Sequence, residues 1–90
     1  MNTYVVTFEI NDGARKAQLK KVFSDGTTPF CPIHDNAFAI KSDKTSKEIL
    51  NELVKITVNP DRIFVVRSGT AAAWSNSYGE KNSEWLKKNL

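Results

Sequence analysis

Residues 3 to 10 carry the pattern that most limits what this chain can fold into. Large apolar side chains alternate with smaller or polar ones through the segment YVVTFEI. A period of two is typical of a β-strand with one buried face. The bulky set is expected to face the core: Tyr4, Val6, Phe8 and Ile10. The other set is expected on the opposite face, where a carboxylate stays near water: Val5, Thr7 and Glu9.

The segment after this strand predicts a helix and then a hairpin. Asp12 is suited to cap a helix that runs to about residue 23. The apolar residues of segments 30–34 and 37–41 predict two strands joined by a tight turn. Pro32 places the first of these strands at an edge of the sheet, because proline cannot donate a hydrogen bond to a ladder.

Two more helices and one more strand complete the pattern. Thr45 and Glu48 have the T-x-x-E spacing of a capping box that opens a second helix. The segment RIFVV, residues 62–66, predicts a fourth strand. A last helix is expected over residues 80–89, with Ser77 as its cap in another S-x-x-E pattern.

The order of these elements predicts the fold class. A chain of 90 residues makes one domain. Strand, helix, strand, strand, helix, strand is the ferredoxin-like arrangement, an α+β fold with a four-stranded antiparallel sheet. Right-handed crossovers put the first and third strands in the middle and both helices on one face. The C-terminal helix is added after this unit.

The face of the sheet opposite the two helices is expected to be open. Alternation assigns nine side chains to it: Val5, Thr7, Glu9, Ala37, Ala39, Lys41, Ile63, Val65 and Arg67. This surface is half apolar, and a monomer would be expected to cover it or to use it. A partly solvated face and a homodimer packed through this face or its edge both fit. The predicted interface consists of Val5, Thr7, Ile63, Val65, Arg67, Trp74 and Trp85.

Composition excludes several classes of protein. No apolar run approaches the roughly 18 residues that a membrane span needs, so no membrane partner is expected. The N-terminal residues do not have the pattern of a signal peptide. A single cysteine, Cys31, excludes an internal disulfide and fits a reducing cytoplasm, where we expect the protein to be located.

The charge pattern leaves nucleic-acid binding open. The net charge is +3, which tolerates a polyanionic partner without requiring one. One cluster on the first helix is a candidate nucleic-acid contact or, as the commoner outcome, a solvated helix face: Arg15, Lys16, Lys20 and Lys21. RNA-recognition domains share the predicted topology but stack bases on aromatic residues of the two central strands. The open positions of those strands contain no aromatic residue here, so that class is excluded.

Cys31 and His34 form a C-x-x-H pattern on the predicted edge strand. A structural zinc site requires four ligands, and the sequence contains no second pair of Cys or His residues. An odd offset of three places the two side chains on opposite faces of a regular strand, which also argues against a nucleophile pair unless Pro32 distorts the strand. A small buried cysteine is the expected outcome.

Several segments together resemble a known family. They are YVVTFEI, the capped helix KTSKEILNEL, the strand DRIFVVRSG, the small-residue loop around Trp74, and the final SEWLKKNL. In this order they resemble the compact ferredoxin-like family around the small nuclease-like subunit of CRISPR adaptation. That family includes VapD-type toxin ribonucleases, and the chain is most similar to its short SinR-like proteins. The resemblance covers nearly the whole chain, although no single motif is specific.

The resemblance implies a role for Glu9. The CRISPR-adaptation relatives end strand one in an aspartate, and two copies across a dimer are proposed to hold a divalent metal for phosphodiester cleavage. Glu9 stands at this position, with one more methylene group. A polar interface residue paired with Arg67 or Lys41 is the favoured interpretation. The oxygen atoms of Asn11 and Asp12 are nearby donors that could help a metal.

Three functions follow as expectations. The first is a homodimer that binds or scaffolds without turnover and needs no cofactor. The second is a metal-dependent nuclease acting on RNA or DNA, with paired Glu9 carboxylates and Mg²⁺ or Mn²⁺ at the dimer interface. The third is a toxin-like endoribonuclease.

Overall fold

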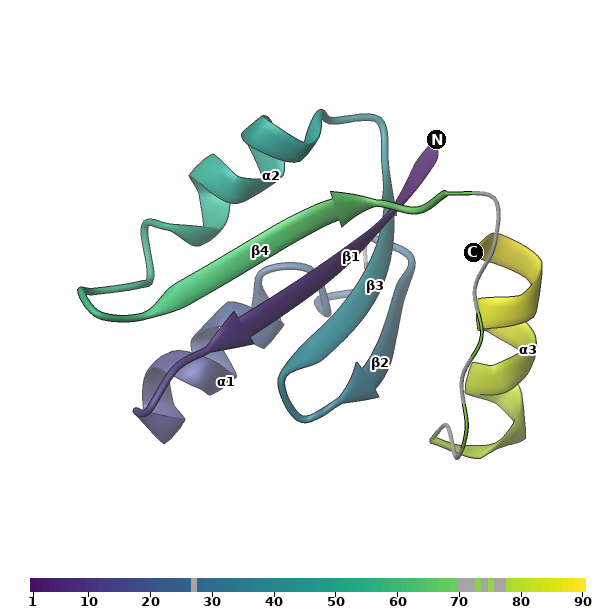
Figure 1. Cartoon of the computed structure of the whole chain (residues 1–90), viewed down its shortest axis with the longest axis horizontal. Coiled ribbons are helices and arrows are strands. Elements are labelled where there is room, and N and C mark those ends of the chain that lie inside the picture. Colours follow the sequence, from purple (N-terminus) through teal and green to yellow (C-terminus); the bar gives the residue numbers. More distant parts are fainter. Residues whose placement is uncertain (27, 70–72, 74, 76–77) are drawn as a thin grey trace.

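A computed structural model, which describes residues 1–26, 28–69, 73, 75 and 78–90, has the predicted order of elements (Figure 1). The strands are β1 (Asn2–Glu9), β2 (Phe30–His34), β3 (Ala37–Ser42) and β4 (Arg62–Arg67). The helices are α1 (Gly13–Lys21), α2 (Ser46–Leu53) and α3 (Gly79–Asn89). The predicted α+β class is thus confirmed: a βαββαβ unit followed by a C-terminal helix.

The four strands form one antiparallel sheet in the order β2-β3-β1-β4. The first and third strands lie in the middle, as the crossover rule predicts. β1 pairs with β3 on one side and with β4 on the other. β4 is therefore the outermost strand at one margin, and in Figure 1 it lies in front of the other strands.

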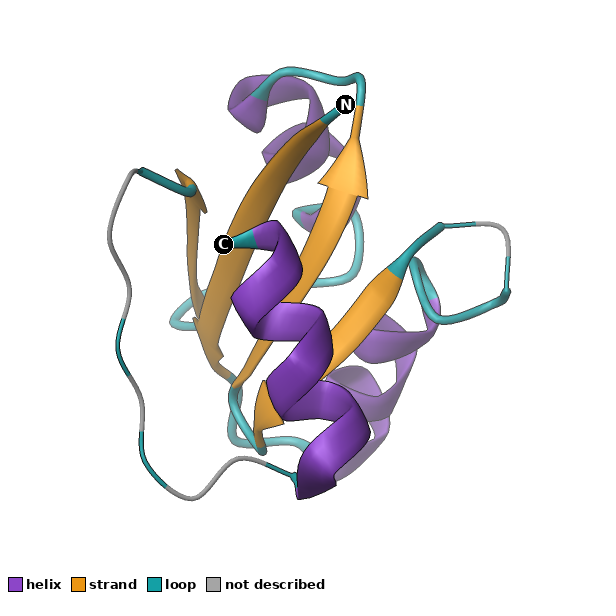
Figure 2. Cartoon of the chain, turned by 90° about the vertical axis from the view of Figure 1, so that its right-hand side faces the viewer, coloured by secondary structure: helices purple, strands orange, loops and turns teal. Residues whose placement is uncertain are grey.

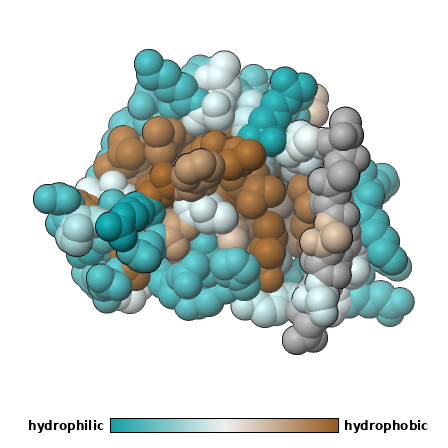
Figure 3. Space-filling model, in the orientation of Figure 1, coloured by the Kyte–Doolittle hydropathy of each residue, from teal (hydrophilic) through white to brown (hydrophobic). Residues whose placement is uncertain are grey.

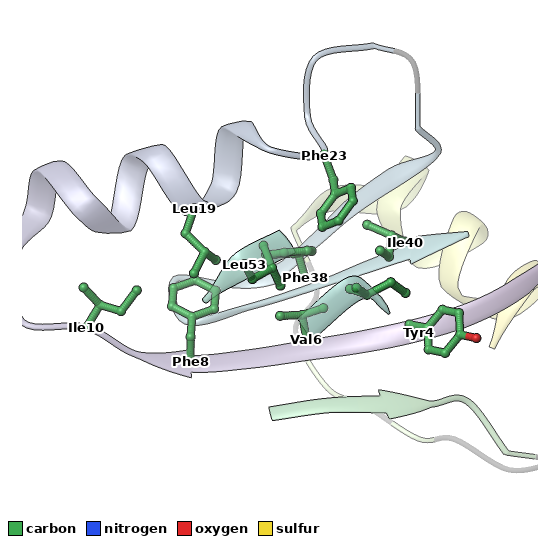
Figure 4. Close-up of a cluster of buried hydrophobic side chains, with 10 residues drawn as sticks. Tyr4, Val6, Phe8, Ile10, Leu19, Phe23, Phe38, Ile40 and Leu53 are labelled. Carbon is green, nitrogen blue, oxygen red and sulfur yellow. The ribbon is translucent and has the colours of Figure 1, made fainter. Parts of the chain in front are cut away.

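The main core lies between the sheet and helices α1 and α2. The bulky set of β1 points toward these helices, and Figure 4 shows it meeting Leu19 of α1 and Leu53 of α2. Phe38 of β3 fills the middle of the cluster, and its ring centroid lies 5.0 Å from that of Phe30 and 6.0 Å from that of Phe8. The alternation in β1 therefore predicted the buried face correctly.

Two helices begin at the caps that the sequence predicts. The Oδ1 atom of Asp12 accepts a hydrogen bond of 2.9 Å from the backbone N–H of Ala14. At α2, Thr45 Oγ1 accepts from the backbone N–H of Glu48 at 3.2 Å, and Glu48 Oε1 accepts from that of Thr45 at 2.9 Å. The bond from the Thr45 backbone N–H is the main cause that lowers the pKa of the Glu48 carboxyl group, and the Thr45 side chain adds to it. Ser77 lies outside the described residues.

The C-terminal helix covers part of the face that was expected to be open. Leu86 of α3 is 2% exposed and packs on Cys31 of β2 and Ala39 of β3. In Figure 2, the helix that carries the C-terminus lies in front of the sheet, and the other helices lie behind it. The expectation of an open second face is therefore wrong for β2 and β3. A small residue at position 39 leaves room for the helix.

Candidate functional site

The sheet surface that no described helix covers lies over β1 and β4. Residues directly opposite in an antiparallel pair share a face, so the register of the two strands identifies its side chains. We call it the β1–β4 surface; it consists of Val5, Thr7, Glu9, Arg62, Phe64 and Val66. Phe64 is 66% exposed and Val66 45% exposed. Figure 3 shows apolar surface, in brown, where Figure 1 draws β4.

The face assignment made from the sequence is wrong for β4. Ile63 lies opposite Phe8, a core residue of β1, and Val65 lies opposite Val6. Both are partly buried and pack against the core beneath α1 and α2. Arg67, opposite Tyr4, shares that side. The four consecutive apolar residues of β4 contain no alternation, so the sequence alone could not identify the outward pair.

Glu9 and Arg62 face each other across β1 and β4. Arg62 Nη1 donates a hydrogen bond of 2.5 Å to Glu9 Oε1. The two side chains are 65% and 76% exposed, so water screens this ion pair. The prediction that Glu9 pairs with Arg67 or Lys41 is wrong. Arg67 lies at the far end of β4, and Lys41 lies opposite Thr3 at the other end of β1.

A shallow hollow of about 400 Å³ lies beside this ion pair. Thr7 and Phe64 line it from the β1–β4 surface, and His34 lines it from the end of β2. The hollow brings together a carboxylate, a guanidinium and an imidazole, which can bind polar groups. Among the described residues, however, no group of three or more His, Cys, Asp or Glu side chains is placed to hold a metal ion.

A bulge in β2 changes the relation between Cys31 and His34. Cys31 pairs with Ala39 and His34 with Ala37, because the register shifts between Pro32 and His34. The two residues therefore share a face, contrary to the expectation from a regular strand. No catalytic pair results, because their environments differ. Cys31 is 1% exposed, and burial raises the pKa of its thiol. His34 is exposed, and its Nδ1 accepts from the backbone N–H of Asn36 at 3.1 Å.

Most basic residues of the cluster on α1 form ion pairs with aspartates. Lys16 and Lys20 both bind Asp35 in the turn between β2 and β3, and their hydrogen bonds, that of Lys16 first, lower the pKa of Asp35. Arg15 Nη2 donates to Asp61 Oδ1 at 3.0 Å. Lys21 is exposed. Pairing with acids leaves little excess positive charge for a phosphate backbone, so nucleic-acid contact at this helix stays a prediction that the geometry does not favour.

The two tryptophans of the predicted interface differ in what the structure describes. Trp74 lies outside the described residues. Trp85 of α3 is partly buried and packs within its own chain against the cluster of Cys31, Ala39 and Leu86. A role for Trp85 in contact with a second subunit therefore remains a prediction, whereas its packing role is observed.

The central strands agree with the exclusion of an RNA-recognition surface. The register of β1 with β3 places Val5 opposite Ala39 and Thr7 opposite Ala37. No aromatic side chain stands on that face of these two described strands. The exposed ring of Phe64 belongs to the edge strand β4. A single edge aromatic residue does not form the two-strand stacking platform of that class.

None of the described helices combines the length and apolar character that a membrane crossing requires. The chain matches no protein-family model, and no curated protein matches it.

Proposed function

We propose that the protein is a homodimer that binds or scaffolds a partner without turnover, and that β4 and its exposed side chains form the dimer contact. The observation that carries this proposal is the exposure of Phe64 and Val66 side by side on the β1–β4 surface. Large apolar side chains gathered on one surface are typical of an interaction site. Two-fold dimers are the commonest assemblies that bury such a surface.

The charges of this surface also suit a second copy of the chain. Glu9 and Arg62 neutralise each other at one end, and the other members are uncharged. Two copies therefore meet no net repulsion when these surfaces approach. An acidic or strongly basic partner would gain little from the same surface.

Substitution of Val66 by lysine tests the contact. Val66→Lys places a charge in the proposed contact, so we expect a dimer to become a monomer of 10.1 kDa by light scattering at micromolar concentration. Val54→Lys is the matched control, because Val54 is also 45% exposed but lies after α2. Wild type and Val54→Lys should both have twice the monomer mass. A monomeric wild type would contradict the proposal.

A metal-dependent nuclease is the second candidate. It is favoured by one observation: Glu9 stands on the same surface as Phe64 and Val66, so face-to-face packing would bring two Glu9 carboxylates toward each other. Carboxylate oxygens are suitable ligands for Mg²⁺ or Mn²⁺. A toxin-like endoribonuclease would use the same chemistry, and its expression should arrest growth.

Glu9→Gln separates the two candidates. The ion pair with Arg62 is exposed, so its loss should change the free energy of unfolding by less than about 1 kcal/mol. If a nuclease is present, Mg²⁺ or Mn²⁺ should support RNA or DNA cleavage by wild type and not by the folded variant. We expect no cleavage by either protein. The control is Asp43→Asn, because Asp43 is 85% exposed and pairs with the N-terminus, away from Glu9. Cleavage that Glu9→Gln abolishes and Asp43→Asn retains would contradict the binding function.

A further inference from the structure

The outer edge of β4 presents backbone groups that are available for pairing. The backbone N–H of Ser68 donates to the carbonyl of Thr3 in β1 at 2.8 Å, so the N–H of Ser68 points toward β1. Bonding alternates along an antiparallel pair, and Phe64 and Val66 therefore also bond to β1. The N–H and C=O groups of the alternate residues point outward: Ile63, Val65 and Arg67. No hydrogen bond joins these outward groups to another residue in the described part of the chain.

The two margins of the sheet differ in their protection. β2 carries Pro32 and a bulge, both of which hinder pairing with another strand. β4 has no proline and no register shift. Its only charged residues are Arg62 and Arg67 at its two ends, with β-branched and aromatic residues between them. An edge of this kind is a template for another strand.

We propose that two copies of the chain pair through their β4 strands, antiparallel and centred on Val65, to form one continuous eight-stranded sheet. This inference rests on the proposed homodimer and specifies its mode. A two-fold axis perpendicular to the sheet at Val65 sets each Val65 opposite its equivalent. Ile63 then stands opposite the partner's Arg67, so all three outward residues of each strand form ladder bonds.

The side chains match in this register. Phe64 stands opposite the partner's Val66 on the β1–β4 surface, and an aromatic residue beside a β-branched one is a favourable cross-strand pair. Arg62 stands opposite the partner's Ser68, so no two arginines face each other. A register centred on Phe64 would leave fewer of the outward groups bonded, because these groups are symmetric about Val65.

Edge pairing has a consequence for Glu9. Arg62, the partner of Glu9, lies three residues from the centre, so the two copies of this ion pair stand roughly 20 Å apart at a rise of about 3.4 Å per residue. Two carboxylates at that separation cannot share a metal ion. The pairing therefore favours the binding function over a two-fold nuclease site.

Amide hydrogen exchange tests the pairing directly on the wild-type protein. At a protein concentration of about 100 times the dissociation constant, roughly a tenth of the chains are monomeric. The outward amides should then exchange roughly tenfold more slowly than in a dilute solution in which all chains are monomeric. Those amides belong to Ile63, Val65 and Arg67. The amides of Phe64 and Val66 are the internal control, because they bond to β1 in either state and should not respond. Dimerisation that leaves the outward amides unprotected overturns the pairing.

Disulfide trapping tests the register in a Cys31→Ala background. The variants Phe64→Cys and Val66→Cys, mixed in equal amounts and oxidised, should form a linked dimer, because the two positions are opposite each other. Each variant oxidised alone should form far less, since equal positions are offset. Links within the single variants that equal those of the mixture would overturn the register.

The outcomes separate this inference from the proposed function. A wild type that is monomeric at every concentration removes the homodimer and the pairing together. A dimer without protection of the outward amides removes the pairing and leaves the homodimer in place. Unlimited, concentration-dependent aggregation also overturns the pairing, because a two-fold contact closes after two chains.

Discussion

At the residue scale, Asp61 belongs to no sequence motif, yet its side chain links α1 to the turn before β4 by hydrogen bonds. It follows the turn after α2, and its side chain is 3% exposed. Both of its oxygens accept from Arg15 of α1, at 3.0 and 3.1 Å, and Oδ2 also accepts from the backbone N–H of Val58. The hydrogen bond from Arg15 is the main cause that lowers the pKa of this carboxyl group, and the bond from Val58 adds to it.

The lowered pKa of Asp61 predicts a pH dependence of stability. A carboxyl group whose pKa is lower in the folded state stabilises the fold above its ordinary value of 3.8, and this contribution is lost as the pH falls through the folded value. Asp61→Asn should therefore lower the free energy of unfolding at neutral pH, and the difference from wild type should shrink below pH 3.8. Urea unfolding over a pH series measures both.

Asp43→Asn is the control for that experiment. Asp43 is 85% exposed and pairs only with the N-terminus among the described residues. Its substitution should leave the unfolding midpoint nearly unchanged at every pH. A difference between Asp61→Asn and wild type that is equal at neutral and acidic pH would show that the ionised carboxylate is not what stabilises the turn.

At the scale of elements, α3 is the part of the fold whose position the sequence did not reveal. Its apolar residues predict a helix with one buried side, but two faces and two edges of the sheet could receive it. The structure places it on β2 and β3, where Leu86 closes over Cys31. The thiol of Cys31 lies within 3.9 Å of the carbonyl oxygen of Asn82 in α3. Access to Cys31 therefore reports on whether α3 is docked.

Leu86→Ala should loosen this helix. The substitution removes most of a buried side chain from the cluster of Cys31, Ala39 and Leu86. We expect the packing of α3 on the sheet to be weakened by about 2–5 kcal/mol. The rate at which a thiol reagent labels Cys31 in native buffer should rise, because α3 can detach while the main core stays folded.

Leu53→Ala provides the comparison for α3. Leu53 is 0% exposed in the main core under α2, so its loss weakens the whole fold without touching α3. If α3 detaches locally, Leu86→Ala should accelerate labelling more than Leu53→Ala at equal global stability. Equal rates at equal stability would mean that Cys31 is exposed only by complete unfolding.

At the scale of the whole molecule, the sheet has two unlike faces and two unlike margins. One face carries α1 and α2, and the other is divided between α3 and the β1–β4 surface. One margin carries Pro32 and a bulge, whereas β4 at the other margin has neither, and no described strand pairs with its outer edge. The proposed dimer uses this asymmetry, because β4 is the margin without a proline or a bulge.

The sequence by itself determined what depends on neighbours along the chain. Alternation gave the buried face of β1, and Asp12 and Thr45 marked the helix starts, because periodicity and capping act over a few residues. The order of elements then left the ferredoxin-like topology as the expected fold. These predictions agree with the structure.

Only the tertiary structure decided which side chains share the candidate surface. A shift of one residue in register moves every side chain to the other face, and register depends on pairing between segments that are far apart in the sequence. The run of apolar residues in β4 fits either face, so pairing with β1 was needed to place Phe64 outside and Val65 inside. The same pairing gave Glu9 its partner, Arg62, and the bulge in β2 brought His34 to their side.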